Sequence, residues 1–286
     1  MDNNQARKTQ ALAAEFKERF IQKWNAFDTK DEFWRPLFTL HPSTKSEEVN
    51  VEQEEMKFYG MSQFSLAQAN KKTYSKRVTR YKHKFFDLHF KVLLEKAKNG
   101  WSEEIEEQSL DLFDTMRQQI DREASSVFDN MFKEDTLALG RTNAPFSRTA
   151  YQETVISLYE AKDISGIYVT LNPTALMISP KLQSKVYEHI SPEDFKNRNV
   201  KVVINPTLKN PASWFLITDA KKGLKCFERK APELDVFAMT GDRNFITGEI
   251  DLSVQSAMIF KISARYSFGY TNPNAVFASN GTGESK

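Results

Sequence analysis

The spacing of apolar residues predicts two long helices. Between residues 5 and 27, apolar side chains recur every three to four positions with basic residues between them, which is the pattern of an amphipathic helix. Its apolar face carries Leu12, Phe16, Phe20, Trp24 and Phe27, and its basic residues are Lys8, Lys17, Arg19 and Lys23. A second apolar stripe predicts a helix from Ser102 to about Phe132, with Ser102 as N-cap and acidic residues in the first turn. The apolar face of the first helix requires a cover, either its own domain or a neighbouring subunit.

A block of alternating short elements lies between Leu171 and Trp214. Residues 175–179 form an apolar run that ends at Pro180, because proline cannot donate a hydrogen bond to a sheet. A short amphipathic helix should follow over residues 181–190. Residues 200–204 are a β-branched run bounded by Asn-Pro, and Trp214 begins the next strand. Taken alone, this block fits an α/β unit of any globular domain.

Several further elements follow from the same reasoning. Residues 71–80 alternate at the period of a strand, and a second strand-like run begins at His83. A helix is expected near residues 151–159. Further strands are expected over residues 224–227, 245–252 and 257–268, with Gly269 ending the last of them.

The polar segment over residues 41–70 lacks a clear period, and we expect a loop that is long for a compact domain. It contains an apolar island at residues 56–61 and an acidic cluster formed by Glu47, Glu48, Glu52, Glu54 and Glu55. Basic residues follow at Lys71, Lys72, Lys76, Arg77 and Arg80. One interpretation is that these opposite charges fix the register of contacts between neighbouring subunits. The other is solvated charge, because exposed pairs contribute only about 0–1 kcal/mol.

Composition narrows the class of protein. The chain has 286 residues, 40% of them hydrophobic, so it can bury a substantial core. A formal net charge of +2 is far from the strongly basic balance of a dedicated nucleic-acid binder. The single cysteine, Cys226, excludes an intrachain disulfide framework and a cysteine-rich zinc site. The sequence has no signal-peptide pattern and no apolar run long enough to span a bilayer, so synthesis in the cytoplasm is expected.

No constellation of residues points to catalysis, and we predict no catalytic residue, no metal and no cofactor. The histidines are scattered along the sequence at His41, His83, His89 and His189. The acidic residues after Ser102 are explained by the dipole of a helix N-terminus. The turn at residues 241–244 lacks the Lys-Ser/Thr pair and the glycines of a phosphate-binding loop. Cys226 has no histidine partner nearby in sequence, so a packing role is predicted.

The order of these signals resembles a known family. After the basic aromatic helix and the long polar segment come YSKRVTRYKHKFFDLHFKVLLEKAKNGW, a long helix ending in DREASSVFDNMF, then TALMISPKLQSKVYEHI, VVINPTLKNPASWFLITD, FERKAPELDVF and FKISARYSFGYTNPNAVF. This order is similar to that of tailed-phage major capsid proteins of the Hong Kong 97 type, and within them to the head subunits of Mu-like phages. The resemblance covers nearly the whole chain after about residue 10.

The resemblance implies a mixed α/β fold of the α+β class with interleaved parts. These would be an N-terminal arm (residues 1–44), an extended loop (45–78), a peripheral domain with a long spine helix (79–171 and 249–286) and an axial domain (172–248). The implied function is a major capsid protein that assembles as hexamers and pentamers into an icosahedral shell around double-stranded DNA. The implied location is the virion, with assembly in the host cytoplasm. Some family members crosslink a loop lysine to an asparagine, but nothing in the sequence favours a pairing.

The resemblance also implies partners and contact residues. Besides itself, the chain would meet a portal, a separate scaffolding protein (because little sequence precedes the arm), a possible decoration protein and, weakly, packaged DNA, but no membrane. Inter-subunit contacts are predicted at Phe16, Phe20, Trp24, Phe33, Trp34, Met56, Phe58, Tyr59, Lys71, Lys72, Lys76, Arg77 and Arg80. Lumenal DNA-facing positions are predicted at Lys8, Lys17, Arg19 and Lys23. Two alternatives remain: an encapsulin-like protein shell that holds enzyme cargo, and a soluble α/β enzyme or binding domain.

Overall fold

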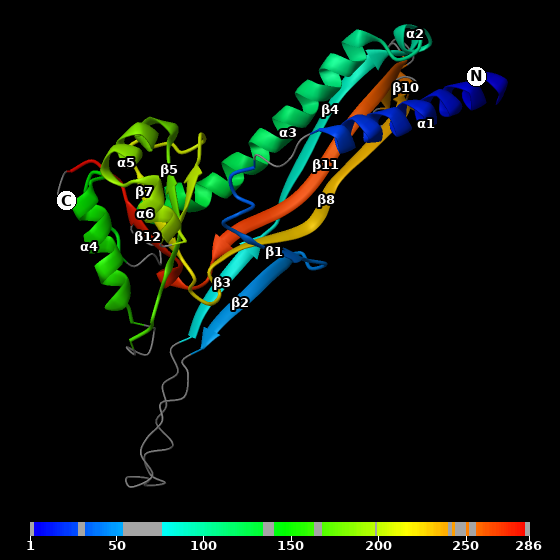
Figure 1. Ribbon diagram of the computed structural model, residues 1–286. Helices are drawn as coiled ribbons and strands as arrows, with labels where there is room; N and C mark the ends of the chain where they lie inside the picture. The colour runs from blue at the N-terminus through cyan, green and yellow to red at the C-terminus, as the bar shows by residue number, and fades with distance from the viewer. Residues whose placement is uncertain are drawn as a thin grey trace, which may run out of the picture. The chain divides into compact units, whose positions relative to one another are not determined.

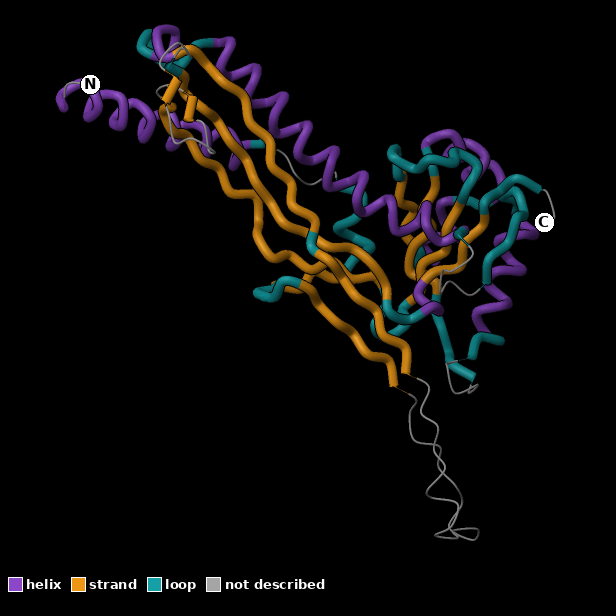
Figure 2. The backbone as a smooth tube through the Cα atoms, turned by 180° about the vertical axis from the view of Figure 1, so that it is seen from behind, coloured by secondary structure: helices purple, strands orange, loops and turns teal. Residues whose placement is uncertain are grey.

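The computed structural model has a mixed α+β fold, as the sequence predicted (Figures 1 and 2). It describes residues 3–27, 32–53, 76–133, 140–162, 168–197, 199–239, 242–243, 250–251 and 256–283. The chain divides into two compact units. Unit 1 comprises Met1–Glu32, His83–Asp121 and Glu228–Tyr266, and unit 2 comprises Phe33–Lys82, Arg122–Phe227 and Ser267–Lys286. Because neither unit is continuous in sequence, both depend on contacts between segments that are far apart in the chain.

Unit 1 is built from long strands and two long helices. Its elements are α1 (Asn3–Ala26), β4 (Lys84–Leu93), α2 (Leu94–Ala97), most of α3 (Glu103–Asp129), most of β8 (Leu224–Met239) and most of β11 (Ala257–Tyr270). The order in the sheet is β8-β11-β4, and β11 runs antiparallel to β4 (Figures 1 and 2). The predicted helices at residues 5–27 and 102–132 therefore correspond to α1 and to α3 with a short 3₁₀ turn, η2 (Asn130–Phe132).

Aromatic side chains form the core of unit 1. Phe260 of β11 lies opposite Phe90 of β4, and the two rings stack with centroids 4.6 Å apart. Phe20 of α1 contacts Phe260 edge-on at 5.6 Å and the ring of Phe113 in α3 at 5.0 Å. Because one α1 side chain touches both the sheet and α3, the two helices pack on the same face of the sheet. Phe16 adds a stacked contact with Phe260 at 5.9 Å.

Unit 2 contains a second sheet of four strands. The strands are β5 (Pro173–Ile178), β6 (Lys201–Ile204), β7 (Trp214–Thr218) and β12 (Val276–Ser279), ordered β12-β7-β5-β6. β5 and β6 are parallel, whereas β7 is antiparallel to both β5 and β12. The crossover between β5 and β6 carries η3 (Pro180–Leu182), α5 (Gln183–His189) and α6 (Pro192–Asn197). The predicted order of strand, Ser-Pro, helix, strand, Asn-Pro and strand is confirmed.

Both faces of this sheet are covered, which explains why its strands are apolar without alternation. Every residue of β7 is buried. On one face, Trp214 and Leu216 belong to a cluster with residues of α5, α6 and α4 (Arg148–Tyr159). On the other face, Phe215 meets the C-terminal part of α3 through Phe128, with ring centroids 5.3 Å apart. The periodicity of β7 could therefore not show which side faced the core.

Asn205 acts as a polar link beneath the sheet, beyond its predicted role as a strand terminator. Its side chain is fully buried, its Nδ2 donates to Ser125 Oγ at 2.8 Å, and its Oδ1 accepts from the Thr207 backbone N–H at 3.0 Å. The amide thus connects α3 to the turn after β6. A buried amide with these partners specifies one geometry, because losing a partner leaves an unsatisfied polar group.

Three features of the fold differ from the sequence predictions. β8 continues to Met239, well past the expected end at residue 227, and it includes Pro232. Gly269 lies inside β11 and does not end it. The polar segment contains strands, β1 (Thr39–Pro42) and β2 (Glu47–Gln53), where we expected only loop. Most of the strand predicted at residues 245–252 lies outside the described residues, apart from the two-residue β10 (Ile250–Asp251), which pairs with β9 (Asp242–Arg243).

Candidate assembly surfaces

A two-stranded ribbon in unit 2 contains acidic and basic residues that we expected on opposite sides of a contact between neighbouring subunits. β2 pairs antiparallel with β3 (Lys76–Lys82), so that Glu47 lies opposite Lys82 and Glu52 opposite Arg77 (Figure 1). The acidic and basic runs are therefore partners within one chain. Contact of these charges with a neighbouring subunit stays a prediction.

The ion pair at the base of the ribbon is exposed and contributes little. Arg80 Nη1 lies 3.0 Å from Glu47 Oε2, and the side chains are 62% and 27% exposed. At such a site an ion pair contributes about 0–1 kcal/mol. Its effect is to favour this register over a shifted one, since a slip by one residue would bring different side chains opposite each other.

The two faces of the ribbon differ in burial. Tyr81 on one face is 3% exposed, whereas Val49 and Val78 on the other are 44% and 49% exposed. Val49 pairs with Arg80 and Val78 pairs with Val51, two positions further along the ladder, so the side chains of Val49 and Val78 lie on the same face. The signal that could have identified β2 is the alternation of Val49 and Val51 with polar residues. The outer face of the ribbon thus combines exposed valines with charged residues, a composition suited to a protein contact.

Tyr81 anchors the ribbon to unit 2. Its ring meets Phe227 of β8 with centroids 4.9 Å apart, and its hydroxyl lies 2.9 Å from Thr271 Oγ1. Burial raises the pKa of Tyr81 above the ordinary range of a phenol. Gly269 lies against this ring: a Cβ at that position would come within 2.7 Å of Tyr81 Cε1. Glycine is therefore needed here because the ring occupies the space of a side chain.

Replacing Gly269 with alanine should destabilise the attachment of the ribbon. The added methyl group overlaps the Tyr81 ring, and overpacking of this kind costs about 1–3 kcal/mol. The measurement is the free energy of unfolding from denaturant titration. In a Tyr81→Ala background the same substitution should have little further effect, because the obstructing ring is gone. An equal loss in both backgrounds would show that the contact with Tyr81 is not the cause.

The aromatic residues predicted to contact neighbouring subunits pack on their own chain. Phe16 and Phe20 are buried in unit 1, and Trp24 contacts Phe113 edge-on at 5.1 Å. In unit 2, Phe33 is buried and Trp34 lies 5.2 Å from Phe268. The apolar face of α1 is therefore covered by its own chain, which is the first of the two alternatives expected for it. Contact of these residues with a neighbouring copy stays a prediction.

The basic residues of α1 take part in contacts within unit 1. Lys17 Nζ lies 2.9 Å from Asp235 Oδ1, and Lys23 forms an ion pair with Glu106. The hydrogen bond from Lys23 lowers the pKa of Glu106. Arg19 lies over the ring of Trp101 at 5.1 Å from its centroid, and Lys8 is exposed. The lysine charges are thus partly compensated, and their contact with DNA stays a prediction.

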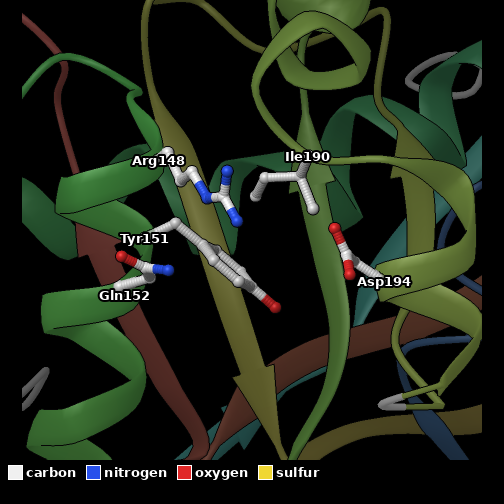
Figure 3. Close-up of a pocket in the computed structure, with 5 residues that line it drawn as sticks. All are labelled: Arg148, Tyr151, Gln152, Ile190 and Asp194. Atoms are coloured by element: carbon white, nitrogen blue, oxygen red, sulfur yellow. The ribbon is translucent and has the colours of Figure 1, made fainter.

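A small pocket lies between α4 and the segment that runs from the end of α5 into α6. Arg148, Tyr151 and Gln152 line it from α4, and Ile190 and Asp194 from the other side; the Tyr151 hydroxyl extends toward Asp194 (Figure 3). Its volume is about 60 Å³. Ligand pockets usually enclose about 300–1,000 Å³, so this one can take no more than a small group.

His41 and Cys226 occupy packed positions in unit 2. His41 stacks near Phe227 with ring centroids 5.4 Å apart, and Cys226 is buried in β8. Within the part of the chain that the structure describes, no group of three or more His, Cys, Asp or Glu residues is placed to hold a metal ion. None of the described helices is long and apolar enough to cross a membrane.

Comparison with known proteins gives no match by sequence, either to a family model or to a curated protein. Solved structures do match. A phage-related protein from Bordetella bronchiseptica RB50 is 10% identical with a TM-score of 0.57, covering 93% of this chain and 97% of that one. A virus-like particle from Pyrococcus furiosus (11% identical, TM-score 0.54) covers 95% and 99%, and the mature capsid of bacteriophage PhiM1 (10% identical, TM-score 0.52) covers 88% and 87%. The chain has the Hong Kong 97 type capsid fold.

The Hong Kong 97 type fold confirms the predicted fold class, and the structure contains the predicted long helix, α3, and the sheet whose first strand is β5. The Mu-like subfamily is not shown by these structures. The predicted contact residues Met56, Phe58, Tyr59, Lys71 and Lys72 lie outside the described residues, and Lys76 and Arg77 lie in β3. The four predicted domains have other boundaries than the two units and remain a prediction.

Proposed function

We propose that this chain is the major head protein of a tailed double-stranded DNA phage, a subunit that assembles as hexamers and pentamers into an icosahedral shell. The observation that carries the proposal is the coverage of the fold: it spans most of this chain and most of the phage capsid chains it matches. A chain with this fold can assemble into a shell through contacts between copies of itself. The function of such a subunit is to form the closed shell, and this assembly requires no catalytic residues.

The ribbon and α1 are the elements through which we expect one copy to reach another. The ribbon presents Val49 and Val78 to solvent beside the Arg80–Glu47 pair. Covering such apolar area stabilises a contact by about 25 cal/mol per Å², so many weak contacts of this kind add up over a shell. The charges beside the valines would select the orientation of the neighbour more than they add affinity.

The proposal includes partners outside the chain. A portal and a separate scaffolding protein are expected, with a possible decoration protein and weak contact with packaged DNA. The near-neutral net charge of +2 suits a container that encloses DNA without binding it tightly. The location would be the virion capsid, after assembly in the host cytoplasm.

A second candidate function is an encapsulin-like shell that holds protein cargo. The observation that favours it is the match to the virus-like particle from Pyrococcus furiosus, which covers 95% of this chain and 99% of that one. The fold is common to both candidates, so the contents of the particle decide between them.

Electron microscopy of the purified protein tests the proposal. The protein should be imaged by negative stain with and without a candidate scaffolding protein, alongside size-exclusion chromatography. Closed shells, tubes or rings of five and six subunits are the expected result, and dependence on the scaffold would favour the phage head over a cargo shell. A monomer or dimer under all conditions would contradict shell assembly and favour a soluble enzyme or binding domain.

Removing the segment between β2 and β3 should abolish closed shells while leaving the body folded. Because Gln53 lies directly opposite Lys76, residues 54–75 can be replaced by Asn-Gly, which closes a two-residue hairpin without disturbing the ribbon. The replacement begins after Gln53 because a deletion that began at residue 46 would also remove β2. The expected result is a wild-type circular dichroism spectrum and unfolding transition, but no closed particles by electron microscopy.

A second variant of unchanged length distinguishes the effect of the apolar side chains from the effect of segment length. In it, residues 56–61 are replaced by glycine and serine, so that the segment keeps its reach but loses its apolar side chains. Shells of normal size from the Asn-Gly variant would contradict the role proposed for this segment in assembly.

A further inference from the structure

A cleft in unit 2, separate from the ribbon, has no role in the proposed assembly contacts. It lies between β1, the start of β8 and the turn after β7, and its volume is about 400 Å³. This value falls within the range of about 300–1,000 Å³ typical of binding pockets. Its apolar lining comprises Pro36, Leu37, Ile217, Ala220 and Leu224, and its polar lining comprises Thr39, His41, Thr174, Thr218, Asp219, Lys222 and Lys225.

Lys222 is held at the cleft by an unusual backbone conformation. Its φ is +58°, in the left-handed region that residues with a side chain seldom occupy. Asn272 fixes this turn from another part of the chain: its backbone N–H donates to Lys222 O at 3.1 Å, and its Nδ2 donates to Lys221 O at 3.0 Å. Glycine or asparagine would fit the turn with less strain. A lysine kept in this conformation suggests a requirement for its side chain.

The two lysines place positive charge close together in the cleft. Burial lowers the pKa of Lys225, and the positive charge of Lys222 lowers it further. Within the described part of the chain, no carboxylate forms an ion pair with Lys225. The carboxylate of Asp219 also lines the cleft, but its oxygens accept hydrogen bonds from Asn172 N at 2.8 Å and Asn172 Nδ2 at 2.9 Å. The cleft is therefore lined by two lysines and by one carboxylate that already accepts hydrogen bonds.

We propose that this cleft binds an acidic peptide segment of a partner chain, with a carboxylate placed between Lys222 and Lys225. A carboxylate there would relieve the repulsion between the ammonium groups and form charge-assisted hydrogen bonds. The lining argues for a peptide over a bare phosphate. Leu37, Ile217 and Leu224 can cover an apolar residue next to the acidic one, and the hydroxyl of Thr39 can pair with a peptide backbone. This proposal does not depend on shell assembly.

Binding can be measured by fluorescence anisotropy with a labelled peptide and the full-length protein. The first probe is the acidic sequence of residues 51–56 of this chain, VEQEEM, and the second is a hexamer of glutamate. The neutral control peptide is VQQQQM. We expect the acidic probes to bind, the neutral peptide to bind at least about tenfold more weakly, and inorganic phosphate to compete only poorly.

Substitutions at the two lysines test the site itself. Lys222→Gly should weaken binding about tenfold while leaving the protein as stable as wild type or more so, because glycine relieves the left-handed strain. Lys225→Gln should weaken binding to a similar extent. Lys221→Gln is the matched control, because Lys221 is on the same turn but does not line the cleft, and its effect should be small.

Three results would overturn the proposal. The first is that neither acidic probe binds. The second is that Lys222→Gly and Lys225→Gln leave binding unchanged, which would place the peptide elsewhere on the surface. The third is that phosphate competes as well as the peptide, which would make the site one for a small anion. Shell assembly is measured by electron microscopy, so a failure here is distinguishable from a failure of the proposed function.

Discussion

Replacing Phe20 with alanine should lower the free energy of unfolding by about 3–5 kcal/mol, the usual effect of removing a fully buried ring. Phe20 has 0% exposure and lies where α1 meets both the sheet and α3. Its ring contacts Phe113 at 5.0 Å, Phe260 at 5.6 Å and Phe90 at 6.5 Å between centroids. Alanine would leave a cavity that three rigid rings cannot fill.

Denaturant unfolding followed by circular dichroism measures this effect, with limited proteolysis of α1 as a second observation. Ile21→Ala is the matched control, because Ile21 is the next residue of the same helix and is 36% exposed. Its replacement should change the free energy of unfolding by less than about 1 kcal/mol. A loss below 1 kcal/mol for Phe20→Ala would mean that α1 is not docked on unit 1 in the isolated subunit, which would favour an arm that packs on a neighbour.

Replacing Trp214 with alanine should cost unit 2 about 3–5 kcal/mol. Trp214 is 1% exposed and belongs to the cluster beneath α4, α5 and α6. Its ring meets Phe146 edge-on at 5.5 Å, and its Nε1–H donates to Ala144 O at 3.1 Å. Alanine removes the packing and also leaves the carbonyl of Ala144 without this donor, although Ser279 Oγ donates to the same oxygen at 2.6 Å.

Trp214→Phe separates these two contributions. Phenylalanine keeps most of the buried ring but has no N–H, so the loss should be smaller, about 1–2 kcal/mol. Tyr159→Ala on α4 is the surface control, because Tyr159 is 60% exposed. The measurement is the unfolding transition together with binding of a dye that reports exposed apolar surface. Equal losses for Trp214→Phe and Trp214→Ala would show that the hydrogen bond, and not the packing, accounts for the effect.

The two units explain why so few of the predicted contact residues are accessible in the single chain. Unit 1 covers the aromatic face of α1 with Phe90 and Phe260, and unit 2 covers Trp34 with Phe268. Exposed apolar residues lie at other positions, among them Val49 and Val78 on the outer face of the ribbon and Ile156 and Tyr159 on α4. Large aromatic residues in a sequence identify the core more reliably than they identify an interface.

Local signals in the sequence were sufficient for the helices and for the order of the elements in the second sheet. α1 and α3 follow from apolar residues at helical spacing, and the strands β5, β6 and β7 follow from short β-branched or apolar runs that end at Pro180, at Asn205-Pro206 or in a polar turn. These signals depend on side chains a few residues apart, which is the range over which helix periodicity and proline act.

Contacts between distant residues decided the rest. The acidic segment became β2 because β3, more than twenty residues later in the chain, supplies its partner strand, and the opposite charges of Glu47 and Arg80 meet within one subunit. Gly269 continues β11 because its missing side chain makes room for Tyr81. Lys222 and Lys225 line a common cleft, and Asn272, fifty residues from Lys222, holds the turn at Lys222 in its left-handed conformation. The sequence by itself determined the helices, the strand order around Trp214 and the resemblance to a capsid fold, since these rest on local periodicity and chain order. Strand partners, buried faces and the charged cleft were decided only by the tertiary structure, because they depend on which distant side chains meet.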